Sequence, residues 1–168
     1  MVVHELETLY LTQLRDIYDA AAQVVLVLPK LQATATSPAL RQALSEHLRD
    51  TKELVRNLKG LVNEHGAPPA GVPCRGMTGL LGEATDVLAM RGQASLVDLA
   101  IVAIARQLGH YEIAACDSAS GLARALGFDG DRRELERAAG QAENEDEELA
   151  RIAEELTQRF EDVAGSCV

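Results

Sequence analysis

Tryptophan is absent from the sequence, and aromatic residues make up only 3% of its 168 positions. A hydrophobic core therefore has to be built from leucine, valine, isoleucine and alanine, because hydrophobic residues still reach 47% of the chain. Together with many glutamate and arginine residues, this composition is typical of helical proteins. At this length we expect one domain, at residues 1–161, followed by a flexible tail at 162–168.

A cluster of basic residues is also missing, and the net charge is −10. Nucleic acid and an anionic membrane surface are therefore not expected as partners. The longest apolar run, at residues 99–105, is far shorter than the roughly 20 residues that a bilayer span requires. No signal peptide is recognisable at the N-terminus. Cys74, Cys116 and Cys167 show no CxxC spacing, so we expect neither a disulfide framework nor a zinc site, and we predict a cytoplasmic location.

Apolar residues recur at helical spacing in four long stretches and one short stretch. The long helices are expected near residues 5–33, 38–65, 95–126 and 131–161, and the short helix near 76–90. Ser37, which precedes a proline, is a typical helix start. Ser95 with Asp98, and Asp131 with Glu134, each match a capping box, so we place two further helix starts there.

The spacing of these helices predicts an all-α fold. The links between the first and second and between the third and fourth long helices are short, whereas the link between the second and third is long. This pattern favours a ferritin-like four-helix bundle with one long crossover that contains the extra short helix. The alternative is an up-down-up-down bundle with a fifth packed helix.

Glu145 lies in the apolar seam of the last helix. The seam is formed by Leu135, Ala138, Ala142, Leu149, Ile152 and Leu156. A carboxylate in the seam of a bundle helix costs several kcal/mol unless another group compensates it. Glu145 is therefore interpreted either as a metal ligand or as half of an ion pair, for example with Arg106.

Several short motifs, in the same order and at matching spacing, resemble the YciE/YciF family of bacterial ferritin-like proteins over about residues 6–156. They include residues 14–20 (LRDIYDA), 28–30 (LPK), 36–38 (TSP) and 110–114 (HYEIA). The resemblance implies a ferritin-like fold, a stress-associated role and a homodimer. It also implies a site for two metal ions in the bundle centre, built from one Glu on each of two helices and a Glu-x-x-His pair on each of the others.

This sequence departs from that pattern at three positions where the resemblance implies a carboxylate, because they hold Ala21, Gly109 and Ala142. All three are small residues on apolar stripes, which indicates close helix packing in place of a metal chamber. The pair on the second helix corresponds to Asp50 and Glu53, which also fit the solvated edge of that helix.

The residual candidates for metal ligands are Asp50, Glu53, Glu145 and Glu112, with His110 as a further candidate for a single ion. Iron or manganese would suit such oxygen donors. His110 and His47 are interpreted first as packing histidines. No catalytic or cofactor-binding residue is assigned, because no nucleophile arrangement or phosphate-binding loop is recognisable.

The first functional hypothesis is a ferritin-like, stress-associated protein with a degenerate, metal-free site. It would bind no cofactor, would not be an enzyme, and would act by assembly or through contacts with an unidentified protein partner. The alternative is a di-iron or manganese oxidase, or a peroxide-reducing protein, with unusual ligands at Asp50, Glu53 and Glu145. A third hypothesis is a generic bundle whose cavity binds a small apolar or cationic ligand.

Overall fold

The computed structural model describes residues 5–70 and 73–165, without the side chains of residues 159 and 161–165. This part of the chain folds into five helices and contains no strand. They are α1 (Leu6–Thr34), α2 (Pro38–Glu64), α3 (Arg75–Ala89), α4 (Ala94–Leu126) and α5 (Asp129–Gly165). The last helix thus continues four residues beyond the expected end at residue 161, and the rest of the expected tail, residues 166–168, lies outside the described residues.

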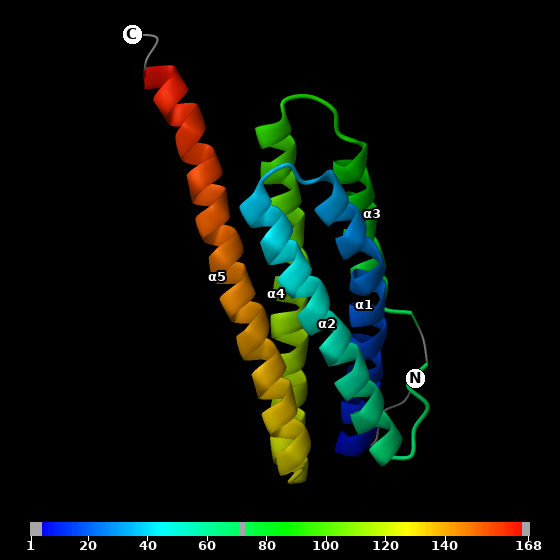
Figure 1. The fold of residues 1–168 in the computed structure, drawn as a ribbon. Coiled ribbons are helices and arrows are strands. Elements are labelled where there is room, and N and C mark those ends of the chain that lie inside the picture. The colour runs from blue at the N-terminus through cyan, green and yellow to red at the C-terminus, as the bar shows by residue number, and fades with distance from the viewer. Residues whose placement is uncertain (1–4, 71–72, 166–168) are drawn as a thin grey trace.

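The four long helices form a bundle, and α3 lies on its outside in the long connection between α2 and α4 (Figure 1). In the bundle, α1 packs on α2 and α4, while α5 packs mainly on α4 and also on α2. Helix α3 covers α1 and α4. The expected four-helix bundle with one long crossover and an extra short helix is therefore confirmed.

Helix ends follow the sequence signals in part. Ser37 caps α2, because its hydroxyl accepts a hydrogen bond from the backbone N–H of Leu40, as expected. Gly127 closes α4 in the left-handed conformation, with φ of 76°, where a residue without a Cβ atom is favoured. The two capping boxes expected at Ser95 and Asp131 are wrong, since α4 begins at Ala94 and α5 begins at Asp129.

Asp98 makes contacts with another part of the chain in place of capping its own helix. Its carboxylate is buried in the first turns of α4 and accepts three hydrogen bonds from the link between α1 and α2. The donors are the backbone N–H and the hydroxyl of Thr36, at 2.8 and 2.7 Å, and the backbone N–H of Ser37, at 2.9 Å. This carboxylate therefore joins two chain segments about 60 residues apart at one end of the bundle.

Asp131 has the same role at the opposite end. It lies in the first turn of α5, where its Oδ2 atom accepts a hydrogen bond from the Tyr10 hydroxyl at 2.7 Å and lies 2.7 Å from His65 Nε2. The rings of Tyr10, His65 and Phe128 pack against one another around this contact. Three helices, α1, α2 and α5, are thus tied together at this end of the bundle.

Replacement of Tyr10 by phenylalanine is expected to lower the free energy of unfolding by about 1–2 kcal/mol, because the buried Asp131 loses one hydrogen-bond donor. Urea denaturation measures this loss. Tyr18→Phe is the matched control, since Tyr18 is only partly buried against the same apolar cluster, and we expect a smaller effect there. Equal losses in the two variants would show that the hydroxyl of Tyr10 contributes no more than general packing.

Helix α3 is held against the bundle by polar contacts at its start. The backbone N–H of Cys74 donates to Asp19 at 2.6 Å, and the Tyr111 hydroxyl lies 2.8 Å from the Cys74 thiol and donates to Asp16 at 2.9 Å. A Cβ atom at position 76 would lie 3.1 Å from the Tyr111 ring, so Gly76 permits this close approach. Cys74 is therefore a buried structural cysteine.

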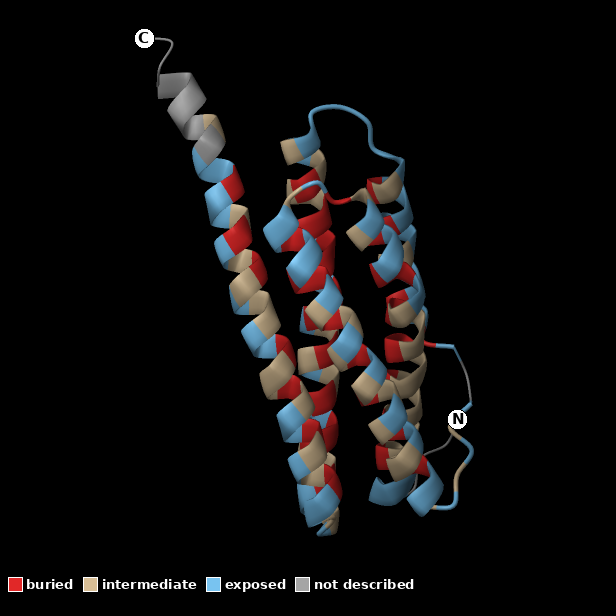
Figure 2. Ribbon diagram, in the orientation of Figure 1, coloured by how far each residue is buried: buried red, intermediate tan, exposed pale blue. Residues whose placement is uncertain are grey.

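The bundle interior contains two apolar clusters, one above the other along its length, and buried residues face inward on every long helix (Figure 2). On α2 the first cluster ends at Leu44 and the second begins at Leu54. On α4 the corresponding residues are Leu108 and Cys116. Between these residues, α2 and α4 have no large apolar side chain that is fully buried, and a layer with polar side chains separates the two clusters near the middle of the bundle.

Candidate functional site

Polar side chains from three helices meet in this central layer. Helix α2 contributes His47, α4 contributes Glu112 and α5 contributes Glu145, whereas no residue of α1 lines the small cavity beside them. The exposed fractions of the side chains are 2% for His47, 5% for Glu112 and 15% for Glu145. Each of these residues continues the buried face of its own helix, so the packing of the long helices brings them together.

The imidazole of His47 lies between the two glutamates. Its Nε2 atom is 3.7 Å from Glu112 Oε2 and 3.8 Å from Glu145 Oε2. These distances are ion-pair distances and are too long for hydrogen bonds. Accordingly, both ring nitrogens of His47 and the Oε1 atom of Glu112 are buried without a hydrogen-bond partner.

The charges in the layer depend on one another. Burial alone would lower the pKa of His47, but Glu112 and then Glu145 outweigh this effect and raise the pKa above its ordinary value. Burial raises the pKa of Glu145 to about 7, although the nearby His47 opposes this rise. The group that compensates Glu145 is therefore His47. It is not Arg106, whose guanidinium pairs with Asp146 at 2.7 Å.

The structure brings together three of the four residual ligand candidates. Asp50 lines a small cavity together with Glu112 and Glu145, while its carboxylate also accepts hydrogen bonds from Arg49, which lower the pKa of Asp50. Glu53 does not join them, because its side chain is 40% exposed and pairs with Arg137 at 3.1 Å. It therefore belongs to the solvated edge of α2, as one of the two sequence interpretations stated.

The structure places two histidines differently from the interpretation based on the sequence. His110 is 58% exposed and lies 3.3 Å from Asp146, away from the central layer. His47, interpreted from the sequence as a packing residue, is the imidazole of the polar centre. The available signal was its spacing, since His47 and Asp50 are three residues apart and so share one side of α2.

The three small residues that replace expected carboxylates, Ala21, Gly109 and Ala142, are all buried. Ala142 lines the same small cavity as Glu112 and Glu145. A two-metal centre of the ferritin-like kind needs carboxylates from all four helices and two imidazoles. This layer offers three carboxylates and one imidazole, with none from α1, and the residues present therefore do not fit two metal ions.

The donor atoms are also spread apart. Among the residues that the structure describes, no three His, Cys, Asp or Glu side chains are grouped so that they could hold a metal ion. Both cysteines in the described ranges, Cys74 and Cys116, are buried and free, and Cys167 lies outside these ranges. None of the helices in the described part of the chain is long and apolar enough to cross a membrane.

Comparison with known proteins gives one family and several relatives. The model of the family described as a domain of unknown function, DUF892, matches residues 5–161. The protein YciF of Escherichia coli K12 is 30% identical over 129 residues, which cover 76% of this chain and 78% of YciF.

Three solved structures share the fold. The crystal structure of the E. coli stress protein YciF has a TM-score of 0.88 at 26% identity and covers 93% of this chain and 99% of that one. YcfI, described as a putative structural protein from Rhodopseudomonas palustris, has a TM-score of 0.83 at 33% identity, over 88% and 94% of the two chains. A ferritin-like, diiron-carboxylate protein from Bacillus anthracis is 15% identical with a TM-score of 0.69, covers 90% and 99%, and shows the fold alone.

Proposed function

The chain belongs to the DUF892 family, and we propose that it is a ferritin-like, stress-associated protein with a degenerate two-metal site. In this proposal the protein is not an enzyme and acts by assembly or through contacts with other proteins. The description of its relative YciF as a stress protein supports the stress association. The description of YcfI as a putative structural protein supports a role without catalysis.

The composition of the central layer is the main support for this proposal. A pair of dications would need several carboxylates around it. At three of the positions where a carboxylate is expected, the chain has the buried residues Ala21, Gly109 and Ala142. The remaining carboxylates of Glu112 and Glu145 have a cation of their own, because His47 lies between them. A protein group, His47, therefore compensates part of the buried charge of this layer.

A homodimer is part of the same proposal, and it rests on the resemblance of the chain to its family. The proposal also includes a cytoplasmic location, which agrees with the free thiols of Cys74 and Cys116. We expect the binding partner to be a protein, because the net charge of −10 disfavours nucleic acid.

Elemental analysis tests the metal part of the proposal. Protein expressed in medium supplemented with iron and manganese and purified without chelator is expected to contain well below one equivalent of either metal per chain. The physical reason is that α1 supplies no ligand and Glu53 is paired elsewhere. A content near two equivalents of iron or manganese per chain would contradict the proposal directly.

A second candidate function is an oxidase or peroxide-reducing protein that uses one iron or manganese ion. The observation that favours it is the unpartnered Oε1 atom of Glu112, beside an imidazole nitrogen 3.7 and 3.8 Å from two carboxylate oxygens. Two ligands that each lie about 2.1 Å from one ion can have such a separation. Calorimetric titration with Fe²⁺ and Mn²⁺ separates the candidates, since this one requires binding that Glu145→Ala abolishes, with Glu143→Ala as the control.

A further inference from the structure

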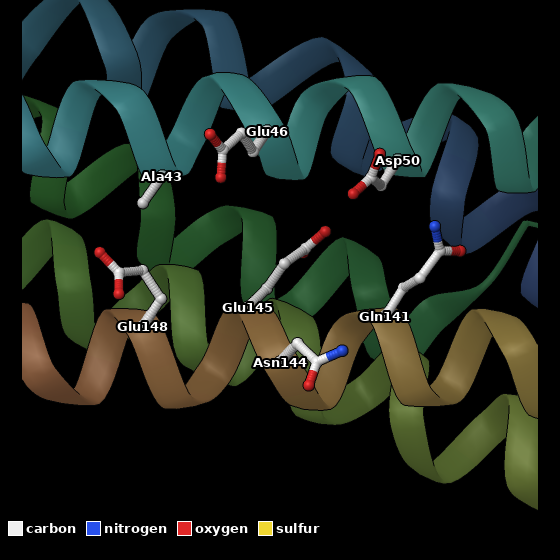
Figure 3. Close-up of a pocket in the computed structure, with 7 residues that line it drawn as sticks. All are labelled: Ala43, Glu46, Asp50, Gln141, Asn144, Glu145 and Glu148. Carbon is white, nitrogen blue, oxygen red and sulfur yellow. The ribbon is translucent and has the colours of Figure 1, made fainter.

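An open groove on the bundle surface leads toward the central layer. It runs between α2 and α5 and has a volume of about 180 Å³. Its carboxylates are those of Glu46 and Asp50 on α2 and of Glu145 and Glu148 on α5, and Figure 3 shows those of Glu46, Asp50 and Glu145 between the two helices. The groove is far larger than one ion needs.

A small inner cavity adjoins the groove and shares Asp50, Gln141 and Glu145 with it. The cavity has a volume of about 10 Å³, which is about enough for one water-sized group. Glu112 lines this cavity, and its buried Oε1 atom accepts no hydrogen bond. A buried carboxylate oxygen without a donor is costly, so the cavity is matched to a small group that donates hydrogen bonds.

The charge of the groove and cavity is negative even after the neighbouring cations are considered. Five carboxylates belong to the two spaces: Glu46, Asp50, Glu112, Glu145 and Glu148. Three cations face them, because Arg49 pairs with Asp50, Arg151 pairs with Glu148, and His47 lies beside the two buried glutamates. With His47 protonated and all five carboxylates ionised, two negative charges have no cationic partner.

The carboxylates are arranged along a line and do not surround one point. Glu46 and Asp50 are four residues apart on α2, which corresponds to about 6 Å of helix rise. No three ligand side chains among the described residues are grouped for a single metal ion. Ala43, one turn before Glu46 on α2, adds an apolar surface at the end of the groove away from the inner cavity (Figure 3). Two carboxylate positions about 6 Å apart along α2 match a short ligand that has positive charges at its two ends.

We propose that the groove between α2 and α5 binds an aliphatic diamine. One ammonium group occupies the inner cavity among Asp50, Glu112 and Glu145, and the second lies between Glu46 and Glu148. An ammonium group is about the size of a water molecule and donates up to three hydrogen bonds, so it supplies the donor that Glu112 Oε1 lacks. This inference rests on the proposed metal-free centre, since an ion at Glu112 would occupy the same cavity.

Isothermal titration of the full chain with 1,4-diaminobutane tests the inference. We expect one site per chain and at least tenfold weaker binding of n-butylamine, which has a single ammonium group. The double variant Glu46→Gln and Glu148→Gln is expected to weaken diamine binding at least tenfold. The control is Glu143→Gln with Glu147→Gln, two exposed residues of α5 outside the groove with the same change in net charge, and it is expected to change the affinity less than twofold.

Several results would overturn the inference. These are the absence of binding, equal affinity for n-butylamine, an equal loss in the control variant, or displacement of the diamine by equimolar Mn²⁺. The titration is repeated after dialysis against a chelator, with the metal content measured before and after. Binding that appears only once metal has been removed would contradict the metal-free proposal while supporting the groove. If protein that contains no metal fails to bind the diamine, the inference about the groove is contradicted and the metal-free proposal is not.

Discussion

Replacement of Asp98 by asparagine is expected to lower the free energy of unfolding by about 3 kcal/mol, the largest loss that we predict. The carboxylate is 2% exposed and accepts three hydrogen bonds from Thr36 and Ser37. Asparagine has nearly the same shape, but its NH₂ group would face N–H or O–H donors. At least one buried backbone N–H would therefore lose its acceptor, and the charge that strengthens the remaining bonds would disappear.

Thermal and urea denaturation measure this effect, and for a protein of this size the loss corresponds to a drop of about 10 °C in Tm. Asp86→Asn is the matched control, because Asp86 is exposed on α3 and we expect a change within about 0.5 kcal/mol. Thr36→Val, which removes only the hydroxyl donor, is expected to give an intermediate loss. If Asp98→Asn and Asp86→Asn were equally stable, the link between α1 and α2 would not depend on this carboxylate.

Replacement of Glu145 by glutamine is expected to stabilise the protein at alkaline pH by about 2 kcal/mol. Burial raises the pKa of Glu145 from an ordinary value near 4.5 to about 7. The folded protein therefore binds this proton more tightly than the unfolded chain, and each pKa unit corresponds to about 1.4 kcal/mol. Ionised Glu145 thus weakens the folded state, while its attraction to His47 offsets part of the cost.

The sign of the pH dependence follows from these directions. Because the folded-state pKa values of Glu145 and His47 are both raised, their contribution to stability is fully present at low pH and is lost as the pH rises through the folded values. The free energy of unfolding should therefore fall between about pH 4.5 and 7 through Glu145, and His47 should extend this fall above pH 6.5. Asp50, Asp146 and Glu148 have lowered pKa values, so their contributions are lost only in more acidic solution.

Urea denaturation at pH 4.5 and pH 8 measures this difference. Glu145→Gln should resemble the wild type at pH 4.5, where Glu145 carries its proton, and should exceed it at pH 8. Glu143→Gln, an exposed substitution on the same helix, should leave the pH dependence unchanged. Destabilisation by Glu145→Gln at both pH values would show that the contact between Glu145 and His47 is net stabilising and would contradict the prediction.

Most of the fold could be predicted because its signals are local. Apolar residues at helical spacing located all five helices, and Ser37 marked the start of α2 through its own side-chain preference. The capping boxes expected at Ser95 and Asp131 failed for the opposite reason, because the carboxylates of Asp98 and Asp131 bind other segments of the chain. Each carboxylate accepts hydrogen bonds from a segment more than 60 residues away, and no local pattern contains that information.

The candidate site could be predicted only in part. Glu145 was identifiable because it interrupts an apolar seam, and Ala21, Gly109 and Ala142 were identifiable because a carboxylate was expected at each. The group that compensates Glu145 was not identifiable, because His47 and Arg106 both lie on helices that face α5 and side-chain direction decides between them. The same is true of Glu53, which points to Arg137 even though it shares a helix with His47.

The two apolar clusters and the polar layer between them also restrict how the helices can slide past one another. Leucine and alanine seams tolerate a shift of one helical turn, about 5.4 Å, because similar side chains repeat along them. Such a shift of α5 would move Glu145 away from His47 into an apolar cluster, while His47 would keep only its contact with Glu112. A single unpaired buried charge costs several kcal/mol. The polar layer thus fixes the axial register of a bundle that its apolar residues alone would leave ambiguous.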